Sequence, residues 1–241
     1  MKNPVRISTF YCFTPLADPA AWKPPILARM KELEVRGTIT LAPEGINATI
    51  SGADAALDAM MAFLHTQIDF TTPTYRASAF SEQPFQRSKV KVKRELISLG
   101  VAAHPAHCVG EYVRPQDWNA LITAPDVVTI DTRNAYEFAL GRFEGAINPG
   151  TRHFKEMVAF TEQHLNPASN QRVAMYCTGG IRCEKYSSYL VASGFRQVHH
   201  LHGGILAYLE QTPASESLWH GTCFVFDERV AVGQGLMAQA G

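Results

Sequence analysis

The sequence predicts an α/β protein made of two consecutive parts, an α+β domain followed by a domain with a parallel sheet covered by helices. Two patterns support this prediction. Up to about residue 100, strands and helices alternate around one tight hairpin, whereas from Asp126 onward short apolar strands alternate regularly with helices. The length of 241 residues is sufficient for two modest domains that each bury a core.

The first part, residues 1–100, contains alternating and amphipathic patterns that predict six elements. A β-branched and aromatic run predicts the first strand, and two short strands flank a turn at 43–45. The first helix is expected only after Pro25, with Ile26 and Met30 on its buried face. The predicted elements are strand 5–13, helix 26–35, two strands within 37–52, helix 53–67 and strand 89–100. This order is the split βαβ pattern of the ferredoxin-like fold.

The rest of the chain is expected to hold a linker with a short helix (101–122), a second domain (123–218) and a C-terminal extension (219–241). Near-continuous apolar runs in the second domain predict strands that are buried on both faces. Its predicted elements are strand 126–133, helix 134–140, helix 153–164, strand 172–177, helix 184–193, strand 197–201 and a helix after 202–204. Asn134 and Glu137 have the spacing of a capping box at the start of helix 134–140. The alternation implies a parallel sheet with helices on both sides.

The charge balance and the cysteine content argue against several classes of protein. Lys and Arg number 22 and Asp and Glu also number 22, so no global positive field indicates a nucleic-acid partner, although a local basic patch is compatible. The five cysteines are an odd, scattered set, which argues against a disulfide scaffold. The N-terminus is a poor signal peptide, and no stretch approaches the roughly 20 apolar residues of a membrane span. We therefore expect a cytoplasmic protein with reduced thiols and no membrane association.

The strongest chemical signal is the segment "YCTGGIRCEK" at 176–185. The strand before it delivers Cys177 to the carboxyl edge of the sheet, where ligands bind in open α/β folds. Two glycines allow backbone N–H groups to converge beside a helix N-terminus, and Arg182 adds a cation, so we expect a thiol with a lowered pKa. Cys177 is therefore the predicted nucleophile. The anion cradle around it is predicted to consist of Thr178, Gly179, Gly180, Ile181 and Arg182.

Three other roles for this segment fit its residues less well. The spacing of Cys177 and Cys183 is not that of a metal knuckle and the other cysteines form no second pair, so no metal site is expected. A cysteine phosphatase loop carries its arginine six residues after the nucleophile, whereas Arg182 lies five residues after Cys177. A merely structural cysteine would need neither the glycine pair nor the arginine. The tight loop suits one extra sulfur atom better than a phosphate.

Around this loop the sequence resembles the rhodanese superfamily. The matching segments are "DTRNAYEFALGRFEGAINPG" at 131–150, "YCTGGIRC" at 176–183 and "GFRQVHHLHGGILAY" at 194–208. One departure is Arg142, where many rhodaneses carry histidine. The resemblance implies a rhodanese-like parallel sheet in which Cys177 carries a persulfide. It also implies that Asp131 and Arg133 support the loop from the end of the neighbouring strand.

Nearly the whole chain is similar to the bacterial tRNA uridine hydroxylase family. Four long motifs match in order, at 36–52, 89–100, 177–185 and 221–232. The resemblance implies a ferredoxin-like, acylphosphatase-like domain joined to a rhodanese domain, and oxygen-dependent 5-hydroxylation of the wobble uridine 34 in tRNA. It also implies molecular oxygen and an electron donor as reactants, and the anticodon region of tRNA as the partner. Many members carry a cysteine-rich tail after the last motif; since this sequence ends at Gly241, we expect any function of that tail to be absent.

The only dense basic cluster in the sequence is the candidate RNA contact. Alternation places Lys89, Lys91 and Lys93 on one face of a strand, and Arg94 follows them. Such a row can contact the phosphates of tRNA. Alternatively, the row is a solvated strand face or protects an exposed edge strand from pairing with other chains, and the functional and the structural interpretation both stay open.

The sequence does not reveal how oxygen is activated. It contains no two-histidine-one-carboxylate pattern and no G-x-G-x-x-G fingerprint, so no cofactor is identifiable. The leading hypothesis is a tRNA-modifying enzyme that acts through Cys177. The alternative is a sulfurtransferase that carries sulfane sulfur on Cys177, while the intact loop disfavours a non-catalytic binding module. Cys183 is a candidate for resolving a persulfide or disulfide on Cys177, and the oligomeric state is left open.

Overall fold

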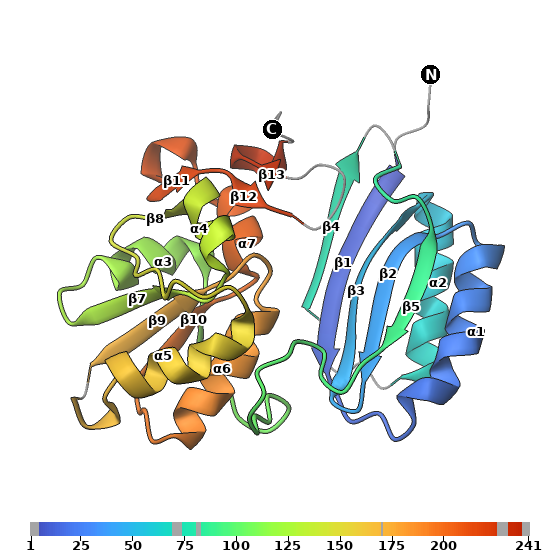
Figure 1. The fold of residues 1–241 in the computed structure, drawn as a ribbon. Coiled ribbons are helices and arrows are strands. Elements are labelled where there is room, and N and C mark those ends of the chain that lie inside the picture. The colour runs from blue at the N-terminus through green and yellow to red at the C-terminus, as the bar shows by residue number, and fades with distance from the viewer. Residues whose placement is uncertain (1–4, 69–73, 81–82, 170, 226–230, 238–241) are drawn as a thin grey trace. The chain divides into compact units, whose positions relative to one another are not determined.

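The computed structural model divides the chain into two units, Met1–Leu96 and Ile97–Gly241, and each unit has its own sheet and core (Figure 1). It describes residues 5–68, 74–80, 83–169, 171–225 and 231–237. Within these ranges, no helix is long and apolar enough to cross a membrane.

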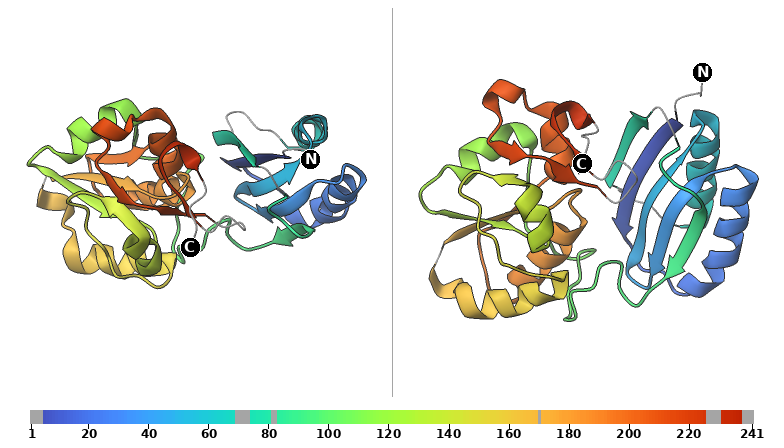
Figure 2. Two further views of the ribbon diagram at one scale, coloured as in Figure 1. Left: turned by 90° about the horizontal axis from the view of Figure 1, so that it is seen from above. Right: turned by 45° about the horizontal axis from the view of Figure 1, so that its top comes forward.

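The first unit is a five-stranded sheet with two helices on one of its faces (Figures 1 and 2). Its strands in spatial order are β4 (Thr74–Phe80), β1 (Val5–Phe13), β3 (Gly45–Gly52), β2 (Arg36–Ala42) and β5 (Ser88–Val92). Neighbouring strands are antiparallel except β2 and β5, which run parallel. The helices are α1 (Pro19–Glu32) and α2 (Asp54–Gln67). The predicted ferredoxin-like fold is confirmed, with one further strand at the edge of the sheet.

Three details of this unit differ from the prediction. No strand was predicted at β4, because "TYRASAF" lacks the β-branched apolar run that marks the other strands. The strand expected at 89–100 ends at Val92 and is the additional edge strand rather than the fourth strand of the fold. Helix α1 begins at Pro19 rather than after Pro25, because the Asp18 carboxylate accepts hydrogen bonds from two first-turn N–H groups and proline suits the first helical position.

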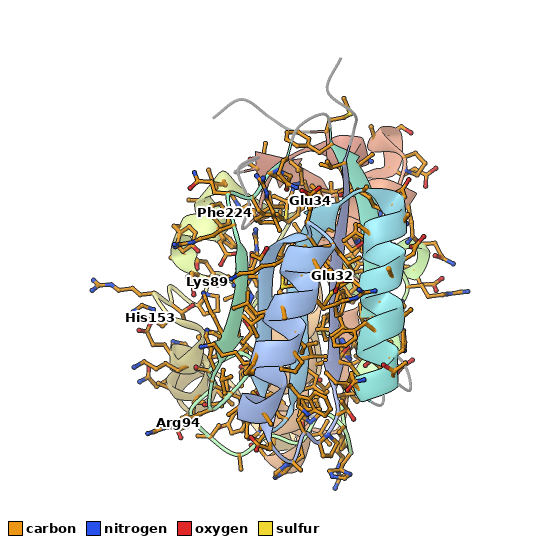
Figure 3. All side chains as sticks on the ribbon, turned by 90° about the vertical axis from the view of Figure 1, so that its right-hand side faces the viewer. Glu32, Glu34, Lys89, Arg94, His153 and Phe224 are labelled. Carbon is orange, nitrogen blue, oxygen red and sulfur yellow. The ribbon has the colours of Figure 1, made fainter. Side chains whose placement is uncertain are left out.

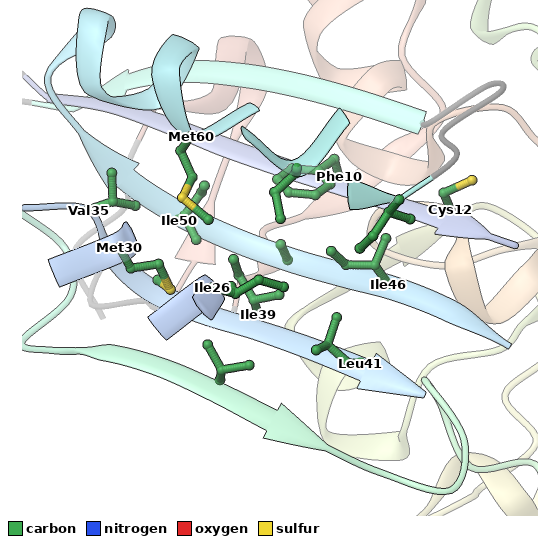
Figure 4. Close-up of a cluster of buried hydrophobic side chains, with 14 of the residues drawn as sticks. Phe10, Cys12, Ile26, Met30, Val35, Ile39, Leu41, Ile46, Ile50 and Met60 are labelled. Atoms are coloured by element: carbon green, nitrogen blue, oxygen red, sulfur yellow. The ribbon is translucent and has the colours of Figure 1, made fainter. Parts of the chain in front are cut away.

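The core of the first unit lies between the sheet and its two helices, as Figure 4 shows in close-up. The sheet contributes Phe10, Ile39, Ile46, Ile50 and Val90, and the helices contribute Ile26, Met30, Leu57, Met60 and Leu64. Side chains alternate between the faces of a strand. Burial of Val90 in this core therefore places Lys89 and Lys91 on the face of the sheet opposite the helices.

The second unit is built on a four-stranded sheet in which all neighbouring strands are parallel. In spatial order the strands are β6 (Glu111–Val113), β10 (Val198–Leu201), β9 (Arg172–Tyr176) and β7 (Val127–Asp131). The helices are α3 (Pro115–Ile122), α4 (Ala135–Leu140), α5 (Met157–His164), α6 (Ile181–Ala192) and α7 (Gly204–Gln211). Two hydrophobic clusters form, one containing residues of α5 and α6 and the other residues of α3 and α7. The predicted parallel sheet covered by helices is confirmed.

Segments on both sides of the predicted second domain pack into this unit. Residues 111–113, expected in a linker, form the edge strand β6, and Trp118 of α3 is fully buried. Residues after 218, expected to form an extension, contribute β11 (Trp219–Gly221), which pairs with β8 (Gly141–Phe143), and β12 (Cys223–Phe224), which pairs with β13 (Ala231–Val232). The sequence alone does not indicate this, because two- and three-residue strands carry almost no periodic signal.

Candidate active site

The centre of the site is the loop between β9 and α6, at the carboxyl edge of the parallel sheet. Cys177 directly follows β9, and its Sγ accepts a hydrogen bond from the Gly180 N–H at 3.1 Å. Gly180 has a φ of 106° and caps α6, a backbone conformation that favours glycine. The thiol is 1% exposed, while Gly179 and Ile181 are partly exposed. The loop therefore turns tightly enough to direct one of its own N–H groups at the sulfur atom.

The thiol of Cys177 is held in its ionised form at neutral pH. Burial alone would raise its pKa, but a hydrogen bond from the Cys183 thiol, the charge of Arg182 and the backbone N–H groups of Cys183 and Gly180 lower the pKa to about 5. Burial, together with the neighbouring Cys177, raises the pKa of Cys183 instead. Cys183 therefore stays protonated and can donate to the thiolate. Its Sγ also lies 3.5 Å from the Thr132 hydroxyl oxygen.

Arg182 forms a buried, two-pronged ion pair with Glu137 of α4. Its two terminal nitrogens donate to the carboxylate at 2.7 and 2.9 Å, and one of them also donates to the Thr178 hydroxyl at 3.2 Å. Burial opposes ionisation of Glu137, but the hydrogen bonds and charge of Arg182 lower its pKa. The guanidinium is thus bound to a carboxylate and shapes the loop, in addition to acting on the thiolate as a positive charge.

Glu137 has a larger role than the sequence indicated. The expected capping contact exists, since its carboxylate accepts the Asn134 N–H at 3.0 Å. The same carboxylate holds Arg182 and lies 3.4 Å from the Thr178 hydroxyl. The sequence could not show that a helix cap and a loop arginine 45 positions apart would meet. The only signal was that both residues lie in motifs that match one family.

Asp131 and Arg133 form a second buried ion pair near the loop. Arg133 donates to the Asp131 carboxylate at 2.6–3.1 Å and to the Gly141 carbonyl at 2.6 Å. Its guanidinium lies 5.1 Å from the Trp219 ring centroid and 5.8 Å from that of Tyr176. This pair connects the end of β7 to β8 and β11, so any support for the cysteine loop is indirect.

The residue between them, Thr132, makes the direct connection to the loop. Its N–H and its hydroxyl both donate to the Tyr176 carbonyl at 3.0 Å, immediately before Cys177, and the hydroxyl oxygen lies against the Cys183 sulfur. Nothing in the sequence singled out Thr132. Threonine is common in loops, and only the register of β7 against β9 brings it to this position.

The start of α7 holds the other side of the loop. The Ile205 N–H donates to the Cys177 carbonyl at 2.9 Å, and the Leu206 N–H donates to the Thr178 carbonyl at 3.1 Å. Gly204 makes this approach possible, because it has a φ of 65° and carries no side chain. The segment "HGG" at 202–204, which leads into α7, therefore allows the start of this helix to hold the cysteine loop in place.

The predicted basic row lies in the first unit, along the edge strand β5. Lys89 and Lys91 share one face of the sheet and stand opposite Thr38 and Thr40 of β2. Lys93 and Arg94 follow the strand and are exposed; Lys89 and Arg94 are labelled in Figure 3. The edge position is the one that edge protection requires, and it also leaves the row open to a phosphate backbone.

In the described part of the chain, the histidines of β10 occupy structural positions. His200 is fully buried, its Nε2 lies 3.1 Å from the Gly110 carbonyl oxygen, and burial lowers its pKa to about 4. His199 lies on the other face of β10 and pairs with Glu111. Across the described ranges, no group of three His, Cys, Asp or Glu side chains is placed to hold a metal ion.

The fold and the loop define a rhodanese-like domain preceded by an acylphosphatase-like domain. Family models agree: the UPF0176 acylphosphatase like domain matches residues 5–96, and the rhodanese-like domain matches residues 114–211. The chain belongs to the tRNA uridine(34) hydroxylase family. It is 52% identical to the tRNA uridine(34) hydroxylase of Picosynechococcus sp., over 98% of this chain and 79% of that protein.

Solved structures resemble the two units separately. The rhodanese-like domain of an Anabaena sp. protein is 18% identical to this chain, with a TM-score of 0.38. The alignment covers 46% of this chain and 78% of the Anabaena chain. An acylphosphatase from Coxiella burnetii is 11% identical to this chain, with a TM-score of 0.29. The alignment covers 37% of this chain and 95% of the acylphosphatase.

The lowered pKa of Cys177 predicts an unusual pH dependence of its reactivity. Alkylation by iodoacetamide, measured by mass spectrometry of the peptide that contains Cys177, is expected to proceed at a rate that does not change with pH near neutrality. It should fall as the pH drops through about 5, whereas a free cysteine loses reactivity below about 8.5. Cys183→Ala removes a hydrogen-bond donor to the thiolate, so in this variant the midpoint of the pH profile for alkylation of Cys177 should lie at higher pH. The exposed Cys108 in the same digest controls for the reagent, and equal midpoints in the two proteins would contradict the role assigned to Cys183.

Gly204 provides a test of how the loop is held. A Cβ there would lie 2.5 Å from the Cys177 carbonyl oxygen, 2.6 Å from that of Thr178 and 2.8 Å from the Gly179 nitrogen. Gly204→Ala is therefore expected to displace the loop, lower the melting temperature and change the alkylation rate of Cys177. Gly145→Ala is the matched control, because Gly145 has a φ of 71° but a Cβ at that position would have no atom within 4 Å. Gly145→Ala should destabilise the protein only by the backbone strain of about 1–2 kcal/mol. Equal changes in the alkylation rate of Cys177 in the two variants would refute the role of Gly204.

Proposed function

We propose that this chain hydroxylates uridine 34 of tRNA at carbon 5 and that Cys177 is its nucleophile. The observation that carries the proposal is the 52% identity to a tRNA uridine(34) hydroxylase over nearly the whole chain. The reactive thiolate supports it, because a nucleophile with a low pKa is what activation of a pyrimidine ring requires. The proposal includes the anticodon region of tRNA as the binding site and the cytoplasm as the place of action.

The thiolate has a defined task in this reaction. Carbon 5 of uracil is a weak nucleophile until a group adds to carbon 6. Addition of the Cys177 thiolate forms a carbon–sulfur bond and shifts the ring electrons toward carbon 5, which then attacks an oxidant derived from molecular oxygen. Loss of the carbon 5 proton breaks the carbon–sulfur bond and regenerates the thiolate. One oxygen atom enters the base and the other becomes water, using two electrons and two protons from a separate donor.

Access to the thiol requires that the base leaves its stack. Cys177 is 1% exposed, so a base within a helical stack could not reach its sulfur atom. Enzymes that modify bases commonly extrude the target nucleotide into a pocket. The anticodon loop is single-stranded, which makes the extrusion of its wobble base less costly.

A rhodanese-type sulfurtransferase is the second candidate. The observation in its favour is the Gly180 N–H directed at the Cys177 sulfur, since such a donor would also stabilise the outer sulfur of a persulfide. Formation of thiocyanate from thiosulfate and cyanide, lost in Cys177→Ala, would support this activity. Sulfur transfer without any change in tRNA nucleosides would favour it over hydroxylation.

The basic row on β5 is proposed to contact the tRNA backbone. Lys89 and Lys91 lie on the sheet face that the helices do not cover, and Lys93 and Arg94 follow them directly after β5. Phosphate contacts of this kind position the RNA without reading its sequence.

The role of Cys177 can be tested in cells. In a strain whose only copy of the gene carries Cys177→Ala, 5-hydroxyuridine and its derivatives at tRNA position 34 should fall to the level of a gene deletion. Mass spectrometry of tRNA nucleosides gives the readout, and immunoblotting confirms that the variant accumulates. Cys108→Ala is the matched control, since Cys108 is exposed and should be dispensable. Normal modification in the Cys177→Ala strain would rule out a catalytic thiol.

The role of the basic row can be tested by salt dependence. Lys89→Gln combined with Lys93→Gln should weaken binding of tRNA in a filter assay. Each lost phosphate contact should reduce the slope of log affinity against log salt by about 1. Lys23→Gln is the control, because Lys23 is an exposed lysine on helix α1, which covers the sheet face opposite Lys89 and Lys91. An unchanged slope in the double variant would leave edge protection as the role of these lysines.

A further inference from the structure

A half-exposed tyrosine lies on the helix that is bound to the cysteine loop. Tyr136 is the second residue of α4 and is 50% exposed. The next residue, Glu137, is fully buried and holds Arg182 and Thr178 of the loop. Since consecutive helical residues point in different directions, Glu137 fixes α4 against the loop while Tyr136 faces outward.

The ring of Tyr136 is held in place by the last motif of the sequence. Phe224 of β12 packs against it at right angles, with ring centroids 5.4 Å apart; Phe224 is labelled in Figure 3. Perpendicular contacts of this kind are favourable and restrict the ring. This contact gives the motif at 221–232 a role at the site. An aromatic residue held in this way loses little conformational entropy when a ligand binds.

A segment rich in basic residues begins at a backbone contact with the same helix. The first N–H of α4, that of Ala135, donates to the Thr151 carbonyl at 2.8 Å. The chain continues from Thr151 into Arg152, His153 and Lys155, and all three are exposed; His153 is labelled in Figure 3. The nearby Glu156 carboxylate accepts the backbone N–H of Arg152 at 2.7 Å.

We propose that Tyr136 is a base-stacking residue for the nucleotide adjacent to the target uridine, with Arg152, His153 and Lys155 contacting the neighbouring phosphates. An aromatic side chain beside cations is the combination that binds single-stranded RNA in general. When the target base leaves its stack, its neighbour loses a stacking partner, and the Tyr136 ring replaces it. The inference rests on the proposed action on tRNA and adds the residues that would hold the opened loop.

A protein contact is the competing use of this surface. Leu140 lies one turn after Tyr136 on the same face of α4 and is 43% exposed. Two neighbouring apolar side chains could bind another protein without any RNA. The cations Arg152 and Lys155 favour RNA, because a purely apolar contact has no use for exposed positive charges.

The test uses the full chain and an anticodon stem-loop RNA with uridine at the wobble position. The base next to this uridine is replaced by 2-aminopurine, whose fluorescence reports stacking. Binding of the wild type should change the fluorescence, Tyr136→Phe should preserve the change, and Tyr136→Ala should abolish it. Tyr136→Ala should also weaken binding about tenfold, which is within the range measured for one stacked base. Leu140→Ala, which keeps the tyrosine ring, should behave as the wild type.

The outcomes separate this inference from the proposed function. If the wild type does not bind the stem-loop, the tRNA proposal itself fails. If the wild type binds and Tyr136→Ala gives the same fluorescence change and affinity, only the stacking role is refuted. Equal losses in Tyr136→Ala and Leu140→Ala would refute a specific stacking role of the tyrosine ring. A change in oligomeric state of the variants, measured by light scattering, would assign the surface to a protein contact. Unchanged circular dichroism of the variants excludes misfolding as the cause.

Discussion

The buried ion pair between Arg182 and Glu137 is the interaction on which the site depends. It joins α4 to the start of α6 and, through Thr178, to the loop between β9 and α6. Removal of one partner of a buried ion pair leaves an uncompensated charge and lowers the stability of the fold by about 3–5 kcal/mol. The position of the loop, and therefore of the Cys177 sulfur, is thus tied to the position of α4. The same link fixes α4, and with it the exposed Tyr136, against the loop that carries Cys177.

The thiolate itself is stabilised more by hydrogen bonds than by a free positive charge. Glu137 already pairs with Arg182, so the guanidinium acts on Cys177 only in part, and the Cys183 thiol is the larger favourable contribution to its ionisation. Such a division has a chemical advantage. A thiolate tightly paired with an arginine would be a poor nucleophile, whereas one held by a neutral thiol and by backbone N–H groups stays ionised and available.

Parts of the chain that look peripheral complete the second unit. The strand β6 extends the sheet on one edge, and Trp219 of β11 covers the guanidinium of Arg133. Cys223 is buried beside the ion pairs, and Phe224 packs against Tyr136. A domain boundary placed by composition alone would separate these residues from the site that they support. The segments before β7 and after α7 therefore belong to the fold of this unit and also support its site.

The sequence by itself determined the two-part organisation, the order of most strands and helices, and the location of Cys177 in a glycine-rich loop at a strand end. These properties are local, because periodicity and turn chemistry extend over only a few residues. It also marked Arg182, Glu137 and Asp131 as members of the matching motifs. Only the tertiary structure decided which of them meet: Arg182 with Glu137, Asp131 with Arg133, and Thr132 with the carbonyl before Cys177. Such contacts depend on strand register and helix packing between distant segments, for which one sequence carries no direct signal.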